Sequence, residues 1–112
     1  MIDNIEYLTI NNIYYRKVLF TTKHQQLVIM SIPNGVEIGS EVHPNTTQFI
    51  KIEKGSGEAV IKNKHYTIGP GSVVIVPPNI KHNIISHAKN GLKLYTIYSP
   101  PEHKKNLVQV NP

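Results

Sequence analysis

Residues 47–78, "TQFIKIEKGSGEAVIKNKHYTIGPGSVVIVPP", consist of short apolar runs separated by turns. The runs are rich in Val, Ile, Phe and Tyr, which favour strands, and each run is shorter than an ordinary helix. The intervening residues, 54–57, 63–64 and 69–71, contain the glycine, proline and asparagine that are typical of turns. Many short strands at close, regular spacing predict an all-β sandwich or barrel.

The same pattern extends in both directions, from Tyr14 to Val110. No segment of helical length keeps a period near 3.6, so helix is expected only in the first dozen residues, and in less than about one tenth of the chain. The further runs expected to be strands are 14–20, 25–32, 37–43, 81–87 and 92–99.

Three turns carry more specific predictions. Gly55 and Gly57 permit positive φ, and Asn63 tolerates the left-handed region, so hairpins are expected at 54–57 and at 63–64. After Pro77-Pro78, Asn79 can occupy a turn position that glycine normally takes, and the next strand then begins near His82.

The chain has 112 residues and no break in composition, which predicts a single domain, residues 1–112. Within it we expect a barrel over about 14–100 and a C-terminal extension over 101–112, which is either loose or an arm that pairs with another subunit. There is no cysteine, and this excludes disulfides, thiolate metal ligands and a thiol nucleophile.

Basic residues give a formal net charge of +5, but the lysines are scattered and Arg16 is the single arginine. Nucleic-acid binding usually requires clustered basic residues, so an anionic small molecule is a better expected partner than DNA or RNA. No apolar run is long enough to cross a membrane and the N-terminus does not resemble a signal peptide, so we expect a cytoplasmic protein without a membrane partner.

The segment 39–49, "GSEVHPNTTQF", contains the residues with the most distinctive chemistry. Glu41 and His43 alternate, so on a strand they point to the same face, and a neighbouring antiparallel strand brings Gln48 beside them. If the sheet closes into a barrel, His82 shares the interior with His43. The donor atoms of these residues would then converge, although each residue alone is more often structural.

Two stretches resemble the signature motifs of the cupin superfamily. Residues 39–55, "GSEVHPNTTQFIKIEKG", resemble the first motif, and residues 71–86, "GSVVIVPPNIKHNIIS", resemble the second, with Asn79 in place of its glycine. The resemblance covers 27–99 and implies a double-stranded β-helix, or jelly-roll, barrel. With "LKLYTIYSPPEH" included, the chain looks similar to small single-domain cupins of the mannose-6-phosphate isomerase-like group.

The resemblance implies one divalent metal ion, Fe, Mn, Ni, Co or Zn, held by Glu41, His43, Gln48 and His82. Glu41 stands where the motif has its first histidine, and Gln48 where it has glutamate, so the donor set is richer in oxygen than usual. Gln48, the weakest donor, would either bind the metal or hydrogen-bond a metal-bound water.

The expected function is a metal-dependent enzyme acting on a small molecule, isomerase- or epimerase-like or dioxygenase-like, with Glu41 as the catalytic group that moves protons. The alternatives are a non-catalytic barrel that binds a metal or metabolite, and a scaffold. A homodimer is expected because the N-terminal strands leave an edge that a second copy can cover. Tyr95 and Tyr98 either line the pocket or pack in the core, and structural roles are expected for His24, His65, His87 and His103.

Overall fold

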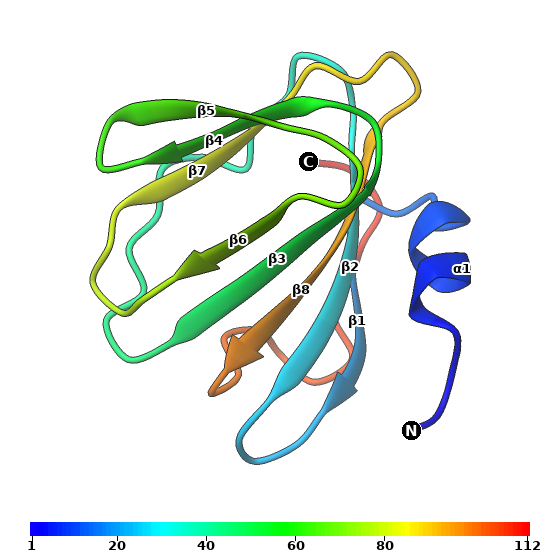
Figure 1. The fold of residues 1–112 in the computed structure, drawn as a ribbon. Helices are drawn as coiled ribbons and strands as arrows, with labels where there is room; N and C mark the ends of the chain where they lie inside the picture. The colour runs from blue at the N-terminus through cyan, green and yellow to red at the C-terminus, as the bar shows by residue number, and fades with distance from the viewer.

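Two antiparallel sheets face each other across one core in the computed structural model, which describes all of residues 1–112 (Figure 1). The larger sheet has the strand order β6-β3-β8-β2-β1-β9, and the smaller has the order β5-β4-β7. The elements are α1 (Ile5–Ile10), β1 (Arg16–Thr21), β2 (Gln26–Ile32), β3 (Thr47–Lys54), β4 (Gly57–Ile61), β5 (Lys64–Ile68), β6 (Val73–Val76), β7 (His82–Ser86), β8 (Leu92–Ser99) and β9 (Val108–Gln109).

Strand alternation builds the core. Along β8, every second residue from Leu92 to Tyr98 is buried, and β3 shows the same alternation. Buried side chains of the large sheet, such as Met30 and Ile52, pack against Ala59 and Ile84 of the small sheet. The predicted all-β architecture is confirmed, and so is the low helix content, since α1 has only 6 residues.

Of the two hairpins predicted from turn residues, one is present, with its turn at 62–63 rather than at 63–64. Ile61 pairs with Lys64, so Lys62 and Asn63 form a two-residue turn with φ of 49° and 68°, which is the left-handed region that this type of hairpin needs. The expected hairpin at 54–57 is wrong, because β3 pairs with β6 and β8 whereas β4 pairs with β5 and β7. Residues 54–57 instead carry the chain from one sheet to the other.

Gly57 is required by close packing rather than by its φ angle. A Cβ atom at this position would lie 2.3 Å from the backbone oxygen of Ile85, on the neighbouring strand β7. By contrast, Gly55 does have the positive φ, 89°, that the sequence led us to expect of it. The two glycines thus serve different purposes within one connection.

The strand expected at 37–43 is also wrong as a continuous element. Only two isolated bridges form, Glu37 with Ile85 and Glu41 with His82, and Gly39 between them has a φ of 103°. At the second bridge the backbone N–H of Glu41 donates to His82 O (2.9 Å) and that of His82 donates to Glu41 O (3.0 Å). This bridge fixes Glu41 beside the first residue of β7.

The C-terminal tail returns to its own barrel. Strand β9 pairs with β1 through Arg16 with Gln109 and Lys17 with Val108. The sequence had left the tail as either loose or an arm for another subunit, and in this structure it covers the edge of β1 instead. At the other end of the chain, α1 contacts strands β8, β2 and β3, and this helix is far too short to cross a bilayer.

Candidate metal centre

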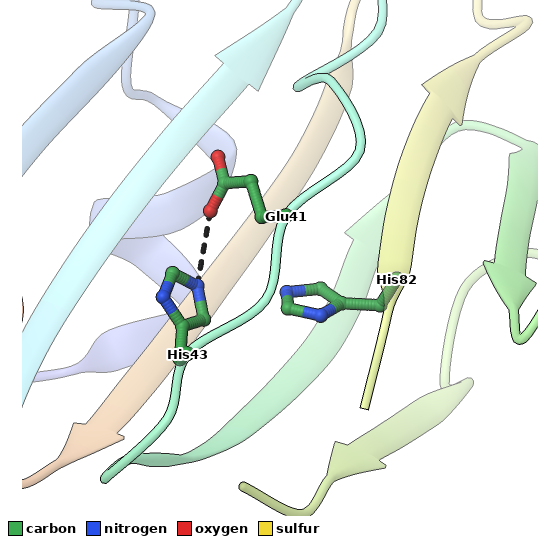
Figure 2. A group of neighbouring side chains, drawn as sticks. All are labelled: Glu41, His43 and His82. Atoms are coloured by element: carbon green, nitrogen blue, oxygen red, sulfur yellow. Dashed lines mark ion pairs between the residues drawn. The ribbon is translucent and has the colours of Figure 1, made fainter. Parts of the chain in front are cut away.

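Glu41, His43 and His82 point into a common space between the two sheets (Figure 2). One ligand atom from each of the three residues lies within 4.8 Å of the other two. Gln48, the second residue of β3, completes the group, because its Oε1 lies 3.0 Å from His82 Nε2. The structure therefore brings together all four residues that the sequence singled out.

The imidazole of His43 has a buried nitrogen without a hydrogen-bond partner. Its Nε2 lies 3.0 Å from Glu41 Oε2, which is within ion-pair distance, but the N–H direction does not meet the carboxylate and no hydrogen bond forms. The side chain of His43 is only 13% exposed, so water does not readily satisfy this atom. An unpaired, buried imidazole nitrogen beside a carboxylate fits the role of a metal ligand.

The contact between His82 and Gln48 brings two acceptors together. His82 Nδ1 lies 2.9 Å from Ile80 O, and because a carbonyl only accepts, Nδ1 carries the proton of the neutral ring. Its Nε2 therefore presents a lone pair to Gln48 Oε1, which is itself an acceptor. A cation between the two lone pairs removes this conflict. A second proton on the ring also removes it, as does a turn of the Gln48 amide that brings its NH₂ group to His82 Nε2 while Thr96 donates to Oε1.

The distances suit a transition metal or zinc. Neighbouring ligands of an octahedral ion, each about 2.1 Å from the metal, are about 3.0 Å from each other. Both close pairs of ligand atoms, His43 Nε2 with Glu41 Oε2 and His82 Nε2 with Gln48 Oε1, have a separation of 3.0 Å. Within each pair, the two donor atoms are therefore spaced as adjacent ligands.

Buried polar contacts hold the group in place. Gln48 Nε2 donates to the hydroxyl of Thr96 (3.0 Å), which orients Oε1 towards His82. Asn79 adopts the positive φ predicted for it, 67°, and its backbone N–H donates to His43 O (2.9 Å). The turn before β7 thus connects the two histidines and explains why a residue tolerant of the left-handed region stands there.

Two residues of the tail, Glu102 and His103, border the group, and sequence reasoning assigned neither to the site. Glu102 Oε2 lies 3.5 Å from His43 Nδ1, so His43 has a carboxylate on each side. In the sequence, only the stretch "SPPEH" of the family resemblance pointed to Glu102 and His103, because their contacts join residues that are far apart in the chain. Burial, followed by the charge of Arg16, lowers the pKa of His103 to about 4.

Of the two tyrosines considered for the pocket, only Tyr98 lies at the site. Its ring is 2% exposed and packs edge-on against His43 (5.9 Å between centroids) and His103 (5.0 Å). Burial raises the pKa of Tyr98, so its hydroxyl stays protonated. Tyr95 projects from the other face of β8 and stacks on Phe49.

The remaining histidines lie away from the group. His24 is in the exposed turn between β1 and β2. His65 and His87 are on the small sheet, on either side of Glu58, with nitrogen–oxygen distances of 3.7 and 3.2 Å. The hydrogen bond from His87 lowers the pKa of Glu58.

The sequence and the structure were also compared with known proteins. Residues 23–108 match the family described as the AraC-like ligand binding domain. Uncharacterized protein L612 of Acanthamoeba polyphaga mimivirus is 40% identical over 111 residues, which is 96% of this chain and 69% of that protein. The crystal structure of BH2720 from Bacillus halodurans superimposes with a TM-score of 0.96 at 32% identity, covering 99% of this chain and 89% of that one.

A more distant structure identifies the fold. An RmlC-like cupin from Shewanella frigidimarina superimposes with a TM-score of 0.72 at 19% identity, covering 79% of this chain and 77% of that one. Together with the family match, this confirms the double-stranded β-helix expected from the two motifs. The chain has the double-stranded β-helix fold of that cupin, and it belongs to the family described as the AraC-like ligand binding domain.

Proposed function

We propose that this protein holds one divalent cation between Glu41, His43, Gln48 and His82, and binds a small molecule through that cation. The observation that carries the proposal is the set of lone pairs that face one another inside the barrel. His43 Nε2 has no hydrogen-bond partner, and His82 Nε2 and Gln48 Oε1 are acceptors 3.0 Å apart. Buried groups of this kind destabilise a protein unless a proton or a cation lies between them.

The donor set limits which cations fit. Two imidazole nitrogens and a carboxylate suit Fe, Mn, Ni, Co and Zn, whereas Ca and Mg prefer oxygen ligands alone. The neutral amide of Gln48 is the weakest of the four donors. A four-residue set also leaves positions on a six-coordinate ion for a ligand from solution.

Glu41 is the residue best placed to meet that ligand. Its side chain is 32% exposed, compared with 13% for His43, so it faces the opening of the site. A bound cation would supply Lewis acidity for a carbonyl or hydroxyl group. The Glu41 carboxylate could then accept or return a proton, which favours isomerase- or epimerase-like chemistry over dioxygenase-like chemistry.

The family description and the surface charge support a small, anionic molecule. The matched family is a ligand-binding domain, and the net charge of +5 attracts anions. A non-catalytic barrel that binds a metal or metabolite requires the same cation site without a reaction. A scaffold requires no cation at all, so metal binding separates these alternatives.

Elemental analysis of the purified protein, followed by titration with Zn²⁺, Mn²⁺ and Co²⁺ after chelator treatment, tests the proposal. We expect one ion per chain and a higher melting temperature with the ion bound. His82→Ala should remove most of the uptake, because it eliminates one of two nitrogen donors. Gln48→Ala should weaken binding by only roughly tenfold, about 1.4 kcal/mol, because water can replace an amide.

The control is His87→Ala, which removes an exposed imidazole outside the group and should leave uptake unchanged. Protons compete for imidazole, so binding should also decrease below about pH 6. Full occupancy in His82→Ala, or no uptake by the wild type with an unchanged melting temperature, would favour the scaffold.

The homodimer and the cytoplasmic location stay predictions. The N-terminal edge that motivated the dimer is covered by β9 of the same chain. The strands at the ends of the two sheets are β6, β9, β5 and β7, and the outer side of β7 meets only the isolated bridges of Glu37 and Glu41. Light scattering at micromolar concentration measures the mass directly, and twice the mass of the 12.6 kDa chain is expected.

A further inference from the structure

The segment 99–103, "SPPEH", lies beside the cation site although it belongs to the C-terminal tail. It follows β8 directly, so the strand that carries Thr96 and Tyr98 also delivers Glu102 to the group. The stretch is part of the resemblance to small cupins, but none of its residues is among the four proposed ligands of the cation.

The backbone of the segment is anchored by Gln26, a fully buried residue of β2. Gln26 Oε1 accepts from the N–H groups of Glu102 (3.2 Å) and His103 (2.9 Å), and its Nε2 donates to His103 O (2.8 Å). The side chain of Gln26 has 0% exposure. Three hydrogen bonds to one buried amide fix the position of the Glu102 backbone.

The carboxylate of Glu102 is fixed separately. The hydroxyl of Thr46, 2% exposed, donates to Oε1 at 2.7 Å. The second oxygen, Oε2, is then directed to His43 Nδ1 at 3.5 Å. Glu102 is therefore held at both its backbone and its side chain, with one oxygen left for the imidazole.

We propose that Glu102 is a positioning residue, which keeps the proton of His43 on Nδ1 and so leaves the lone pair of Nε2 for the cation. Two carboxylates flank His43, and both can only accept. Glu41 Oε2 lies 3.0 Å from Nε2 but makes no hydrogen bond with it. Glu102, 3.5 Å from Nδ1, is therefore the carboxylate that can keep the N–H of the neutral ring on the Nδ1 side. Carboxylates that accept from a ligating histidine fix its tautomer and raise its basicity, and their loss lowers metal affinity by about 10- to 100-fold. This inference rests on the proposed cation site.

Glu102→Gln is the most informative variant. The amide oxygen can still accept from Thr46, but the NH₂ group then faces His43 and donates to Nδ1. The proton of His43 is displaced to Nε2, where it blocks ligation. We expect Zn²⁺ affinity, measured by calorimetry, to fall by about 10- to 100-fold, with a melting temperature of the metal-free protein close to that of the wild type.

The matched control is Glu58→Gln, which makes the same change of charge beside His87 and outside the site. It should bind Zn²⁺ as the wild type does. Equal affinities for the wild type and Glu102→Gln would overturn the proposal. So would a loss of stability in Glu102→Gln that accounts for the whole loss of affinity, because this would indicate a purely structural role.

A measurement on the metal-free wild type makes the test independent of both the variant and the cation. Nitrogen-15 NMR of the histidine rings at pH 8 should show His43 protonated at Nδ1 rather than at Nε2. If the wild type binds no cation but shows this tautomer, the proposed function fails, and only the effect of Glu102 on the His43 tautomer stands. If His43 is protonated at Nε2, the role of Glu102 is wrong whether or not a cation binds.

Discussion

The two ends of the barrel interior are built on the same strands but from different side chains. At one end, the inward residues are aliphatic, such as Leu94, Ile52 and Met30, with 1% exposure or less. At the other end, the inward positions of the same three strands are polar and equally buried: Gln48 of β3, Gln26 of β2, and Thr96 and Tyr98 of β8. Strand alternation decides which residues point inward, and the polarity of the inward residues can then change without a change of fold.

The two ends are stabilised differently. Aliphatic side chains gain from removal of their surface from water, whereas buried polar groups must find hydrogen bonds. The polar end meets this need by internal pairing, such as Gln48 with Thr96 (3.0 Å) and Gln26 with Thr21 (3.1 Å). At this end, His43 Nε2 and His103 Nε2 lack a hydrogen-bond partner, and of these two imidazoles it is His43 that stands beside Glu41 and His82.

The largest expected effect is at the aliphatic end. Leu94→Ala removes a side chain that is 1% exposed and should lower the free energy of unfolding by about 2–5 kcal/mol. Urea unfolding measures this loss, and Zn²⁺ affinity of the folded variant should stay unchanged. Ile97→Ala, on the outward face of the same strand, is the control and should cost less. A lower Zn²⁺ affinity in Leu94→Ala would show that the two ends are coupled.

An intermediate effect is expected from the hydrogen-bonded pair at the polar end. Thr96→Val leaves the amide of Gln48 without its buried acceptor and should cost about 1–3 kcal/mol in urea unfolding of the metal-free protein. The double variant Gln48→Met with Thr96→Val removes both partners and should be more stable than Thr96→Val alone. If the double variant lost the sum of the unfolding free energies lost by the two single variants, the hydrogen bond between Gln48 and Thr96 would not stabilise the polar end.

The last effect is conditional on pH and is absent at neutral pH. The pKa of His103 is about 4 in the folded protein, because of burial and then the charge of Arg16, against an ordinary value of 6.5. Between these values the unfolded chain binds a proton at this residue that the folded protein excludes, so stability decreases as pH falls from about 6.5 to about 4.

His103→Phe keeps an aromatic contact with Tyr98 and cannot take up a proton. Unfolding in urea at several pH values should therefore show a shallower loss of stability than in the wild type. The exposed His24, replaced by alanine, is the control and should leave the slope unchanged. If the stability of the wild type and of His103→Phe fell in parallel as pH decreased, His103 would not be the cause of the loss.

Much of the fold could be predicted because it depends on local patterns. The runs at 47–54 and 92–99 became strands β3 and β8 with the expected bounds, and Asn63 and Asn79 adopted positive φ. The wrong predictions concern which strands pair with each other and which distant residues come into contact. A glycine-rich turn looks the same whether it closes a hairpin or crosses between sheets, and Gly57 is needed because of Ile85, which is distant in sequence.

The site could be predicted only where a motif was present. Glu41, His43, Gln48 and His82 were found from alternation and family resemblance, although Glu41 and His43 lie on a bridge segment rather than a full strand. Glu102 could not be assigned to the site, because nothing near it in the sequence indicates that Thr46 and His43 are its neighbours. Contacts of this kind arise from the packing of the tail.

The short pairing of β9 with β1 has a consequence for the motions of the tail. Two register pairs, Arg16 with Gln109 and Lys17 with Val108, are flanked by single backbone hydrogen bonds from Tyr15 and Val18. This ladder is much shorter than those of β3 and β8, so it can open at a lower cost in free energy while the core stays folded. Amide groups there should exchange with solvent by local fraying, long before those of β3 or β8. Each opening exposes the backbone edge of β1, a surface on which another extended chain can add as a strand.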